Sequence, residues 1–332
     1  MINFDADTII RNYQYIYDRR KTIEEIADEI CDAGFDLLFF TSSGGSMAMM
    51  EPFCHYLNVY SRIPCAAMVS ADFLLTGCNR LTERSVAFMT SKSGDTRETL
   101  ECARKLKEMG VRIVSVLGRE DTPLGSLSDY SFVYNDGRPQ ELVFWFIIGK
   151  IMYNRGAFPQ CSDFADNLSE LGKALVQVRI DCDEKCYRYA EAYGREPYNI
   201  WIGSGDLWPT AYSYSMCVLE ESLWIPTKSV TSAEFFHGTL ELVDRDVCVT
   251  LLLGEGVTRS QDERVREFVR GLTDKLTCFD TRDYELPGIR DEYRKYLSPI
   301  VMAAILQRIG KNAEVILDHP LETRRYYRKS EY

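Results

Sequence analysis

The chain of 332 residues lacks most features of exported, membrane-bound or metal-binding proteins. It has no run of eighteen apolar residues, and its richest apolar stretch, residues 142–151, is too short to span a membrane. Its N-terminus has no basic start followed by an apolar core, so we expect no signal peptide and a cytoplasmic protein. There are only three histidines and no C-x-x-C pair, and Cys182 and Cys186 have no ligand partners nearby. We therefore expect no metal site.

The charge and the cysteines exclude two further classes of protein. A net charge of −11 would repel nucleic acid, although backbone N–H groups can still bind an anionic substrate locally. Of the eleven cysteines, several lie within apolar patterns where cysteine acts as a small hydrophobic residue; these are Cys31, Cys54, Cys65, Cys102, Cys217 and Cys248. We expect free thiols in a reducing compartment.

Short apolar runs alternate with helical periodicity through the whole chain, which predicts the α/β class. The runs predict strands at residues 36–41, 65–69, 85–90, 111–117, 130–134, 199–202, 229–231, 247–253 and 276–279. The main predicted helices are the N-terminal thirty-odd residues, then 96–109, 139–153, 163–193, 209–223, 261–272 and 298–309. Because each half opens with a strand, a Gly/Ser loop and a helix, we predict two tandem doubly wound, flavodoxin-like parallel-sheet domains. These cover residues 1–158 and 159–332.

Two hydroxyl-rich loops in the first half follow predicted strands. The segment SKSGDT, residues 91–96, brings together Ser91, Ser93 and Thr96 at the start of a helix, whose free N–H groups and dipole favour a phosphate. The second loop, residues 42–46, adds Ser43, Gly45 and Ser46 at the same carboxyl edge of the sheet, where ligands bind in open α/β folds. We predict a phosphate site there.

These loops are also compatible with other roles. An ordinary helix cap by Asp95 or Thr96 would explain residues 91–96 without any ligand. Neither loop matches the Walker or the G-x-G-x-x-G pattern, which disfavours nucleotide binding.

The segment SKSGDTRET, residues 91–99, resembles the signature loop of sugar isomerase (SIS) domains. Residues 202–211, the Leu-Glu-Glu at 219–221 and the segment SAEFFHG at 232–238 resemble the second SIS module of glucosamine-6-phosphate synthase. A narrower resemblance, to the fructosamine-6-phosphate deglycases, lies in residues 211–215, 234–238 and 319–326. It implies two SIS domains, a sugar-phosphate substrate, and a homodimer or higher oligomer with shared sites.

The resemblance also assigns acid–base residues in the second half. Glu221 matches the glutamate that acts at the substrate carbons, and His237 matches a histidine that a neighbouring subunit often supplies. A carboxylate and an imidazole suit proton transfer near neutral pH. From composition alone Glu220 is an equal candidate, Glu221 could be a solvated helix residue, and His237 could be an ordinary turn residue.

The C-terminal tail departs from the synthase pattern. Where the synthase has a lysine, this sequence has Arg324 and Arg325, and an arginine stays protonated and forms no Schiff base. We expect both arginines, together with His319 and Glu234, to be possible substrate contacts; a frayed, charged chain end is the alternative. Thr239 stands where relatives usually carry proline, which affects the rigidity of the turn.

These features favour a deglycase, a hydrolase of a C–N bond. It would cleave a glycated amino acid 6-phosphate into a hexose 6-phosphate and a free amine, through an enaminol and an imine. A 2-amino aldose adduct would instead yield fructose 6-phosphate. No cofactor is expected, because the imine is itself the electron sink. The alternatives are an aldose–ketose isomerase of a sugar or amino-sugar phosphate, and a non-catalytic sugar-phosphate sensor.

Overall fold

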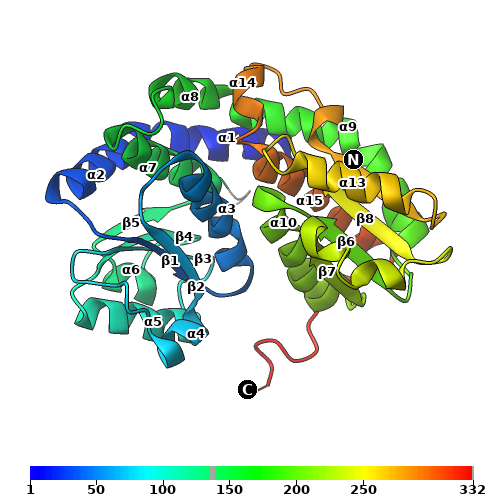
Figure 1. Cartoon of the computed structure of the whole chain (residues 1–332), viewed down its shortest axis with the longest axis horizontal. Helices are drawn as coiled ribbons and strands as arrows, with labels where there is room; N and C mark the ends of the chain where they lie inside the picture. The colour runs from blue at the N-terminus through cyan, green and yellow to red at the C-terminus, as the bar shows by residue number, and fades with distance from the viewer. Residues whose placement is uncertain (135–138, 331–332) are drawn as a thin grey trace. The chain divides into compact units, whose positions relative to one another are not determined.

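A computed structural model describes residues 1–134 and 139–330 (Figure 1). The chain divides into two compact units. The first unit is residues 5–172, and the second joins residues 1–4 to residues 173–332. Each unit is built around one parallel sheet. The predicted α/β class, with two tandem parallel-sheet domains, is therefore confirmed.

The first unit contains five strands and their connecting helices. Its strands are β1 (Leu38–Ser42), β2 (Cys65–Val69), β3 (Val86–Ser91), β4 (Arg112–Leu117) and β5 (Tyr130–Val133). Its helices are α1 (Ala6–Tyr17), α2 (Arg20–Ala33), α3 (Gly44–Tyr60), α4 (Ser70–Thr76), α5 (Arg97–Glu108), α6 (Pro123–Leu127), α7 (Gln140–Asn154), α8 (Cys161–Asn167) and the short η1 (Leu168–Glu170). The strand order is β2-β1-β3-β4-β5, and every pairing is parallel. This is the flavodoxin-like order that the sequence predicted.

The central strands β1, β3 and β4 of the first sheet are buried on both faces, so they are mostly apolar. Phe39 packs on Phe73 of α4 with ring centroids 5.3 Å apart, whereas the next residue, Phe40, stacks on Phe88 across the other face at 5.3 Å. Helices α3 and α7 cover the Phe40 face, and α4, α5 and α6 cover the opposite face (Figure 1). The two-residue period of a strand therefore divides the core into two layers.

The single N-terminal helix predicted from periodicity is wrong, because α1 and α2 are separate helices. The Arg19 guanidinium donates to the Tyr15 carbonyl at 2.9 Å and lies over the Tyr15 ring at 3.5 Å. The Arg19 backbone N–H instead donates to Ile16 O, at 3.0 Å. A side chain thus takes the carbonyl that the next helical turn would have used.

The second unit repeats the plan with four strands. These are β6 (Asn199–Gly203), β7 (Thr227–Thr231), β8 (Cys248–Leu253) and β9 (Leu276–Asp280), in the parallel order β7-β6-β8-β9. Its main helices are α9 (Leu171–Tyr193), α10 (Trp208–Tyr214), α11 (Glu221–Leu223), α12 (Ser232–Phe235), α13 (Arg259–Val269), α14 (Asp291–Arg294) and α15 (Ser298–Ile316). Short helical turns are η2 (Gly205–Leu207), η4 (Thr239–Leu242) and η5 (Thr281–Asp283). Helices α10 and α15 cover one face of the sheet, and α12 and α13 cover the other (Figure 1).

The helix predicted over residues 209–223 is regular only at its start. After α10 the chain widens into a π-helix, η3 (Ser215–Glu220), before the single turn of α11. Trp224 then adopts the left-handed conformation, with φ 58° and ψ 32°. Both features are uncommon and concentrate at functional sites.

Candidate active site

The two hydroxyl-rich loops leave neighbouring strands of the first sheet. Strand β1 runs into α3 on one face and β3 runs toward α5 on the other, so β1 and β3 form the topological switch point. Ligands of open α/β sheets bind at the carboxyl ends of such strands. The buried Ser42 hydroxyl donates to Thr90 O at 2.6 Å, which fastens the ends of the two strands together. The fold thus brings residues 42–46 and 91–96 to one edge.

The loop at residues 91–96 is shaped by its glycine. Gly94 has φ +67°, and its N–H donates to the Ser91 hydroxyl at 2.9 Å. Its carbonyl accepts from Leu124 N at 3.1 Å. A Cβ at Gly94 would lie 2.3 Å from Thr122 Cβ, so no other residue fits without moving the loop. Ser91 donates to no acceptor in the described part of the chain, so its hydroxyl proton is available to a bound phosphate.

The helix-cap alternative does not account for the loop hydroxyls. Thr96 is the N-cap of α5 and Ser43 is the N-cap of α3, yet neither side chain makes a capping hydrogen bond. Asp95 pairs with Arg119 at 3.3 Å. Ser93, Thr96, Gly45 and Ser46 are all partly exposed. The first turns of α3 and α5 therefore present backbone N–H groups beside the Ser43 and Thr96 hydroxyls, neither of which caps its helix; this arrangement suits an anion.

The corresponding edge of the second sheet is filled by its own side chains. The Ser204 hydroxyl, after β6, donates to Thr258 Oγ1 at 2.9 Å, and a Cβ at Gly205 would lie 2.4 Å from that same oxygen. Asp206 and Asp262 are both buried there. Buried carboxylates and a loop occupied by Thr258 make this edge unsuitable for a phosphate.

Asp262 holds α12 against α13. Its Oδ1 accepts from the Ser232 hydroxyl at 2.5 Å, with both residues at most 2% exposed. Burial raises the pKa of Asp262 to about 7; hydrogen bonds from Ser232 and Ser204 oppose that rise, and Asp206 adds to it. Sequence reasoning missed Asp262, although it shares a helical face with the buried Val265 and Val269.

This raised pKa predicts a pH dependence of stability. Between about pH 4 and pH 7 the Asp262 carboxyl holds a proton in the folded state that it has released in the unfolded state. The free energy of unfolding therefore falls as pH rises through this range. From pH 5 to pH 8 the wild type should lose about 2–3 kcal/mol of unfolding free energy that Asp262→Asn keeps. Denaturant unfolding at both pH values measures this difference. The exposed Asp274→Asn is the matched control, and an equal response of both variants would contradict the assignment.

Glu221 is held by the C-terminal tail. Its Oε1 accepts from Arg324 Nη2 at 2.8 Å, and the two side chains are only 30% and 21% exposed. Arg324 is itself fixed, because its Nη1 donates to Leu321 O at 2.6 Å and to Thr323 O at 2.8 Å. The neighbouring Glu220 is exposed and hydrogen-bonds Thr227. The structure therefore distinguishes two glutamates that composition left equal.

The tail is anchored rather than frayed. Leu321 N donates to Glu314 Oε1 at 3.0 Å, and His319 N donates to Glu314 O at 3.0 Å. Burial alone would raise the pKa of Glu314, but the Leu321 N–H and Lys311 lower it overall. The predicted helix 298–309 continues to Ile316 and places this carboxylate directly under the tail.

Two of the predicted tail residues contact the ring of Trp224. The Arg325 guanidinium lies 4.0 Å above its ring, and the His319 ring meets it edge-on at 4.4 Å. His319 Nε2 is buried and has no partner in the described residues. Trp224 was not predicted from the sequence, because no residue pattern indicates that a tryptophan will adopt the left-handed conformation.

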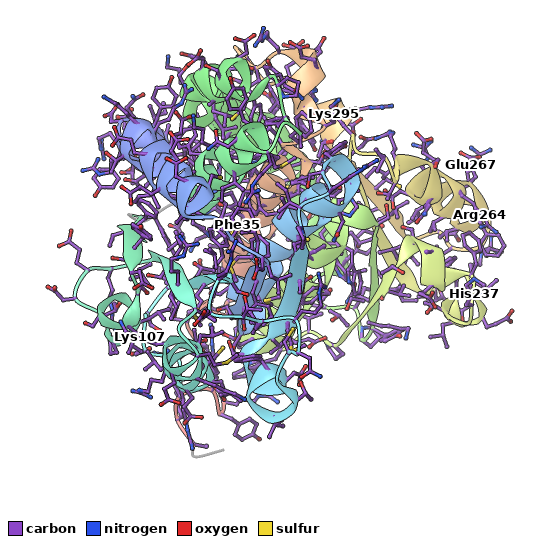
Figure 2. All side chains as sticks on the ribbon, turned by 60° about the vertical axis from the view of Figure 1, so that its left-hand side comes forward. Phe35, Lys107, His237, Arg264, Glu267 and Lys295 are labelled. Carbon is purple, nitrogen blue, oxygen red and sulfur yellow. The ribbon has the colours of Figure 1, made fainter. Side chains whose placement is uncertain are left out.

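His237 lies on an exposed turn after α12. Its backbone N–H donates to Glu234 O at 2.9 Å, and Gly238 has φ +146°. Figure 2 shows its side chain at the outer edge, on the same side as Arg264 and Glu267 of α13. No side-chain contact joins His237 to Glu221 or Glu234 within the described residues, so the structure brings together Glu221, Arg324, Arg325 and His319 but not His237. Thr239 is buried at the start of η4.

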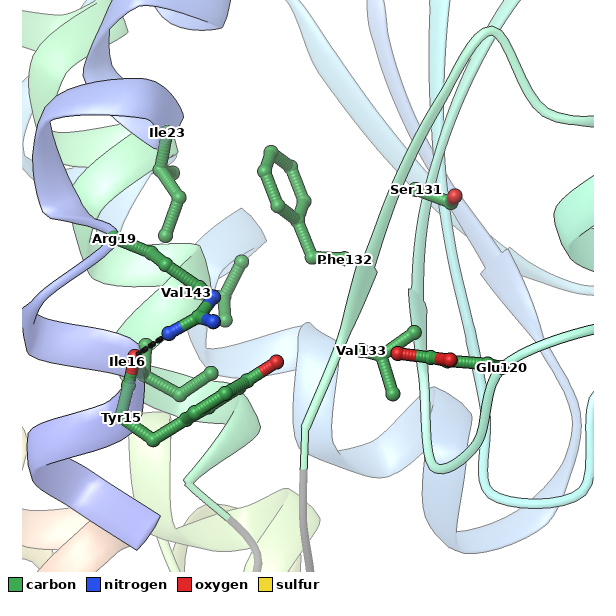
Figure 3. A pocket seen from close by; sticks show the side chains of 9 residues that line it. All are labelled: Tyr15, Ile16, Arg19, Ile23, Glu120, Ser131, Phe132, Val133 and Val143. Atoms are coloured by element: carbon green, nitrogen blue, oxygen red, sulfur yellow. Dashed lines mark hydrogen bonds between the residues drawn. The ribbon is translucent and has the colours of Figure 1, made fainter. Parts of the chain in front are cut away.

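The first unit also has a cavity of about 210 Å³. The side chains in Figure 3 line it: Tyr15, Ile16, Arg19 and Ile23 from the N-terminal helices, with Glu120, Ser131, Phe132, Val133 and Val143. None of the predicted site residues is among them. In the described residues, no helix is long and apolar enough to cross a membrane, and no His, Cys, Asp and Glu side chains gather as a metal site.

Comparison with known proteins agrees with this geometry. The sequence model of the SIS domain matches residues 37–157, which contain both hydroxyl-rich loops. A fructosamine deglycase of Bacillus subtilis is 28% identical over 94% of this chain and 97% of its own length. Residues 37–157 therefore resemble a SIS domain. A fructoselysine 6-phosphate deglycase of Escherichia coli is 23% identical, over 92% of this chain and 89% of its own length.

Solved structures extend the likeness to the fold. A Bacillus subtilis protein provisionally named a phosphosugar isomerase has a TM-score of 0.90 and 26% identity, over 94% of this chain and 97% of its own. The C-terminal domain of a glucosamine-fructose-6-phosphate aminotransferase from Francisella tularensis has a TM-score of 0.78 at 17% identity, with the same coverage. The predicted double SIS fold and the resemblance to deglycases over nearly the whole chain are therefore confirmed.

Proposed function

We propose that this protein cleaves the 6-phosphate of a glycated amino acid into a hexose 6-phosphate and a free amine. The observation that carries the proposal is the pairing of Glu221 with Arg324. A guanidinium remains protonated and forms no Schiff base, so an imine formed beside Glu221 must use nitrogen that the substrate brings. The deglycase relatives support the same reaction class.

Each unit has a separate task in the proposed reaction. Ser91, Ser93 and Thr96 of the first unit bind the phosphate, with Ser43, Gly45 and Ser46. Glu221 removes a proton from C1 to give an enaminol, and the proton returns at C2 to leave an imine at C1. Water then adds to the imine, and one molecule of water is consumed as the C–N bond breaks. Glu221 suits the proton transfer because Arg324 orients it through one oxygen, while its other oxygen has no partner in the described chain.

His237 assists ring opening in this proposal. Its imidazole is exposed on a turn whose base is pinned by the buried Ser232–Asp262 hydrogen bond. An exposed but rigidly mounted histidine is suited to act on a substrate held by a second copy of the chain. We therefore propose a homodimer or higher homo-oligomer, which sedimentation velocity would test.

The test is a panel of fructosamine 6-phosphates assayed for released amine and for glucose or fructose 6-phosphate. We expect amine release from glycated amino acids and none of the interconversion of unsubstituted hexose phosphates that an isomerase would catalyse. Binding of sugar phosphates without turnover of any panel member would instead favour a sensor.

Replacing Lys329 tests whether the enzyme itself supplies the nitrogen of the imine. The Lys329 ammonium donates to Arg324 O at 2.7 Å and is therefore an amine close to the tail arginines. Lys329→Ala should keep turnover, and borohydride should trap no covalent adduct on the wild-type chain. Loss of turnover together with a trapped adduct at Lys329 would show that the enzyme, rather than the substrate, supplies the nitrogen.

A further inference from the structure

Trp224 forms a rigid platform three residues after Glu221. Its left-handed backbone follows directly on the π-helix and on the single turn of α11 that carries Glu221. The His319 ring fixes one edge of the indole at 4.4 Å. The strained conformation of a bulky residue is maintained here by its surroundings, as happens at ligand sites.

Arg325 lies on this platform with its donors uncommitted. Its guanidinium is 4.0 Å from the Trp224 ring, and it has no carboxylate partner among the described residues. When an aromatic ring stacks on the face of a guanidinium, the N–H groups stay in the guanidinium plane. They point outward in the forked arrangement that matches a carboxylate. Its neighbour Arg324 is already engaged by Glu221 and two carbonyls, so the two arginines differ in what they can still bind.

The local charge favours an anion. Residues 324–329 carry four cationic side chains and no acidic one, in a chain whose net charge is −11. The buried Nε2 of His319 lacks a partner on the same platform, which is a second, independent sign of a missing polar ligand. The phosphate is already accounted for by the loops of the first unit, so this second cationic position must serve a different group.

We propose that Arg325, positioned over the Trp224 ring, binds the carboxylate of the amino acid that leaves. The inference rests on the proposed function and narrows its substrate class to glycated amino acids rather than glycated simple amines. Arg325 is thus a specificity-determining residue, because it contacts the part of the substrate that distinguishes these two classes.

Two substrate pairs that differ only in the carboxylate test this inference. One pair is the 6-phosphofructosyl derivatives of glycine and methylamine, and the other is those of lysine (on its ε-nitrogen) and 1,5-diaminopentane. Wild type should prefer the carboxylated member of at least one pair by about tenfold or more in kcat/KM. Arg325→Ala should remove that preference, mainly through KM, and leave the decarboxylated member unchanged. Arg325→Lys should restore it in part.

Arg328→Ala is the matched control, since Arg328 is an exposed arginine of the same tail. It should keep the preference. Equal kcat/KM for both members of each pair, or an equal loss on both in Arg325→Ala, would overturn the carboxylate assignment and leave the deglycase proposal standing. Turnover of no fructosamine 6-phosphate by wild type would overturn both.

Discussion

Replacing Glu221 with glutamine is expected to lower kcat for amine release by about 10²–10⁴-fold, the usual contribution of a general base. The amide oxygen can still accept from Arg324, so the tail should keep its place while the proton acceptor is lost. Affinity for glucose 6-phosphate should stay within about twofold, because the phosphate is bound elsewhere. Steady-state kinetics and calorimetric titration measure the two effects separately.

Glu220→Gln provides the control for this experiment. Glu220 precedes Glu221 in sequence but is exposed and hydrogen-bonded to Thr227. Its replacement should leave turnover nearly unchanged. If the Glu220 variant loses turnover and the Glu221 variant keeps it, the assignment of the base is wrong.

The second large effect is expected for Gly94→Ala in the phosphate loop. An added Cβ would lie 2.3 Å from Thr122 Cβ at a position with φ +67°, so the loop must shift and carry Ser91, Ser93 and Thr96 with it. We expect KM for the phosphorylated substrate and Kd for glucose 6-phosphate to rise together by about 100-fold, a loss of roughly 3 kcal/mol of binding. Overpacking should also reduce the free energy of unfolding by about 1–3 kcal/mol.

Gly156→Ala is the control, because it introduces backbone strain without displacing the loop at residues 91–96. Gly156 has φ +75°, but nothing lies within 4 Å of its would-be Cβ. It should show a stability loss of about 1–2 kcal/mol with unchanged binding of glucose 6-phosphate. Wild-type affinity in Gly94→Ala would show that residues 91–96 do not hold the phosphate.

The strands and the positions of the two hydroxyl-rich loops could be predicted from the sequence because their signals are local. A parallel strand buried on both faces is a continuous apolar run, as Leu38, Phe39 and Phe40 illustrate. The hydroxyl-rich segments follow directly after such runs, so their place at one edge of the sheet comes from the alternation of strands and helices. Glu221 and His237 were found through resemblance alone, since neither has a distinctive local pattern.

The helix boundaries that were predicted wrongly depend on features of the backbone and on a side chain that binds a carbonyl one turn away. Periodicity alone runs unbroken from Ile16 to Ile23, and only the Arg19 side chain, bound to the Tyr15 carbonyl, divides α1 from α2. The π-helix after Tyr214 is equally invisible in the sequence, because one extra residue in a turn changes no residue type.

The sequence by itself determined that this protein has two parallel α/β domains and two hydroxyl-rich loops after strands of the first, since apolar periodicity and glycine placement act between residues close in the chain. Only the tertiary structure decided which glutamate the tail engages, that Arg325 lies over Trp224, and that Asp262 accepts a hydrogen bond from Ser232. These are contacts between residues up to about a hundred positions apart, and their formation depends on how helices and tail pack.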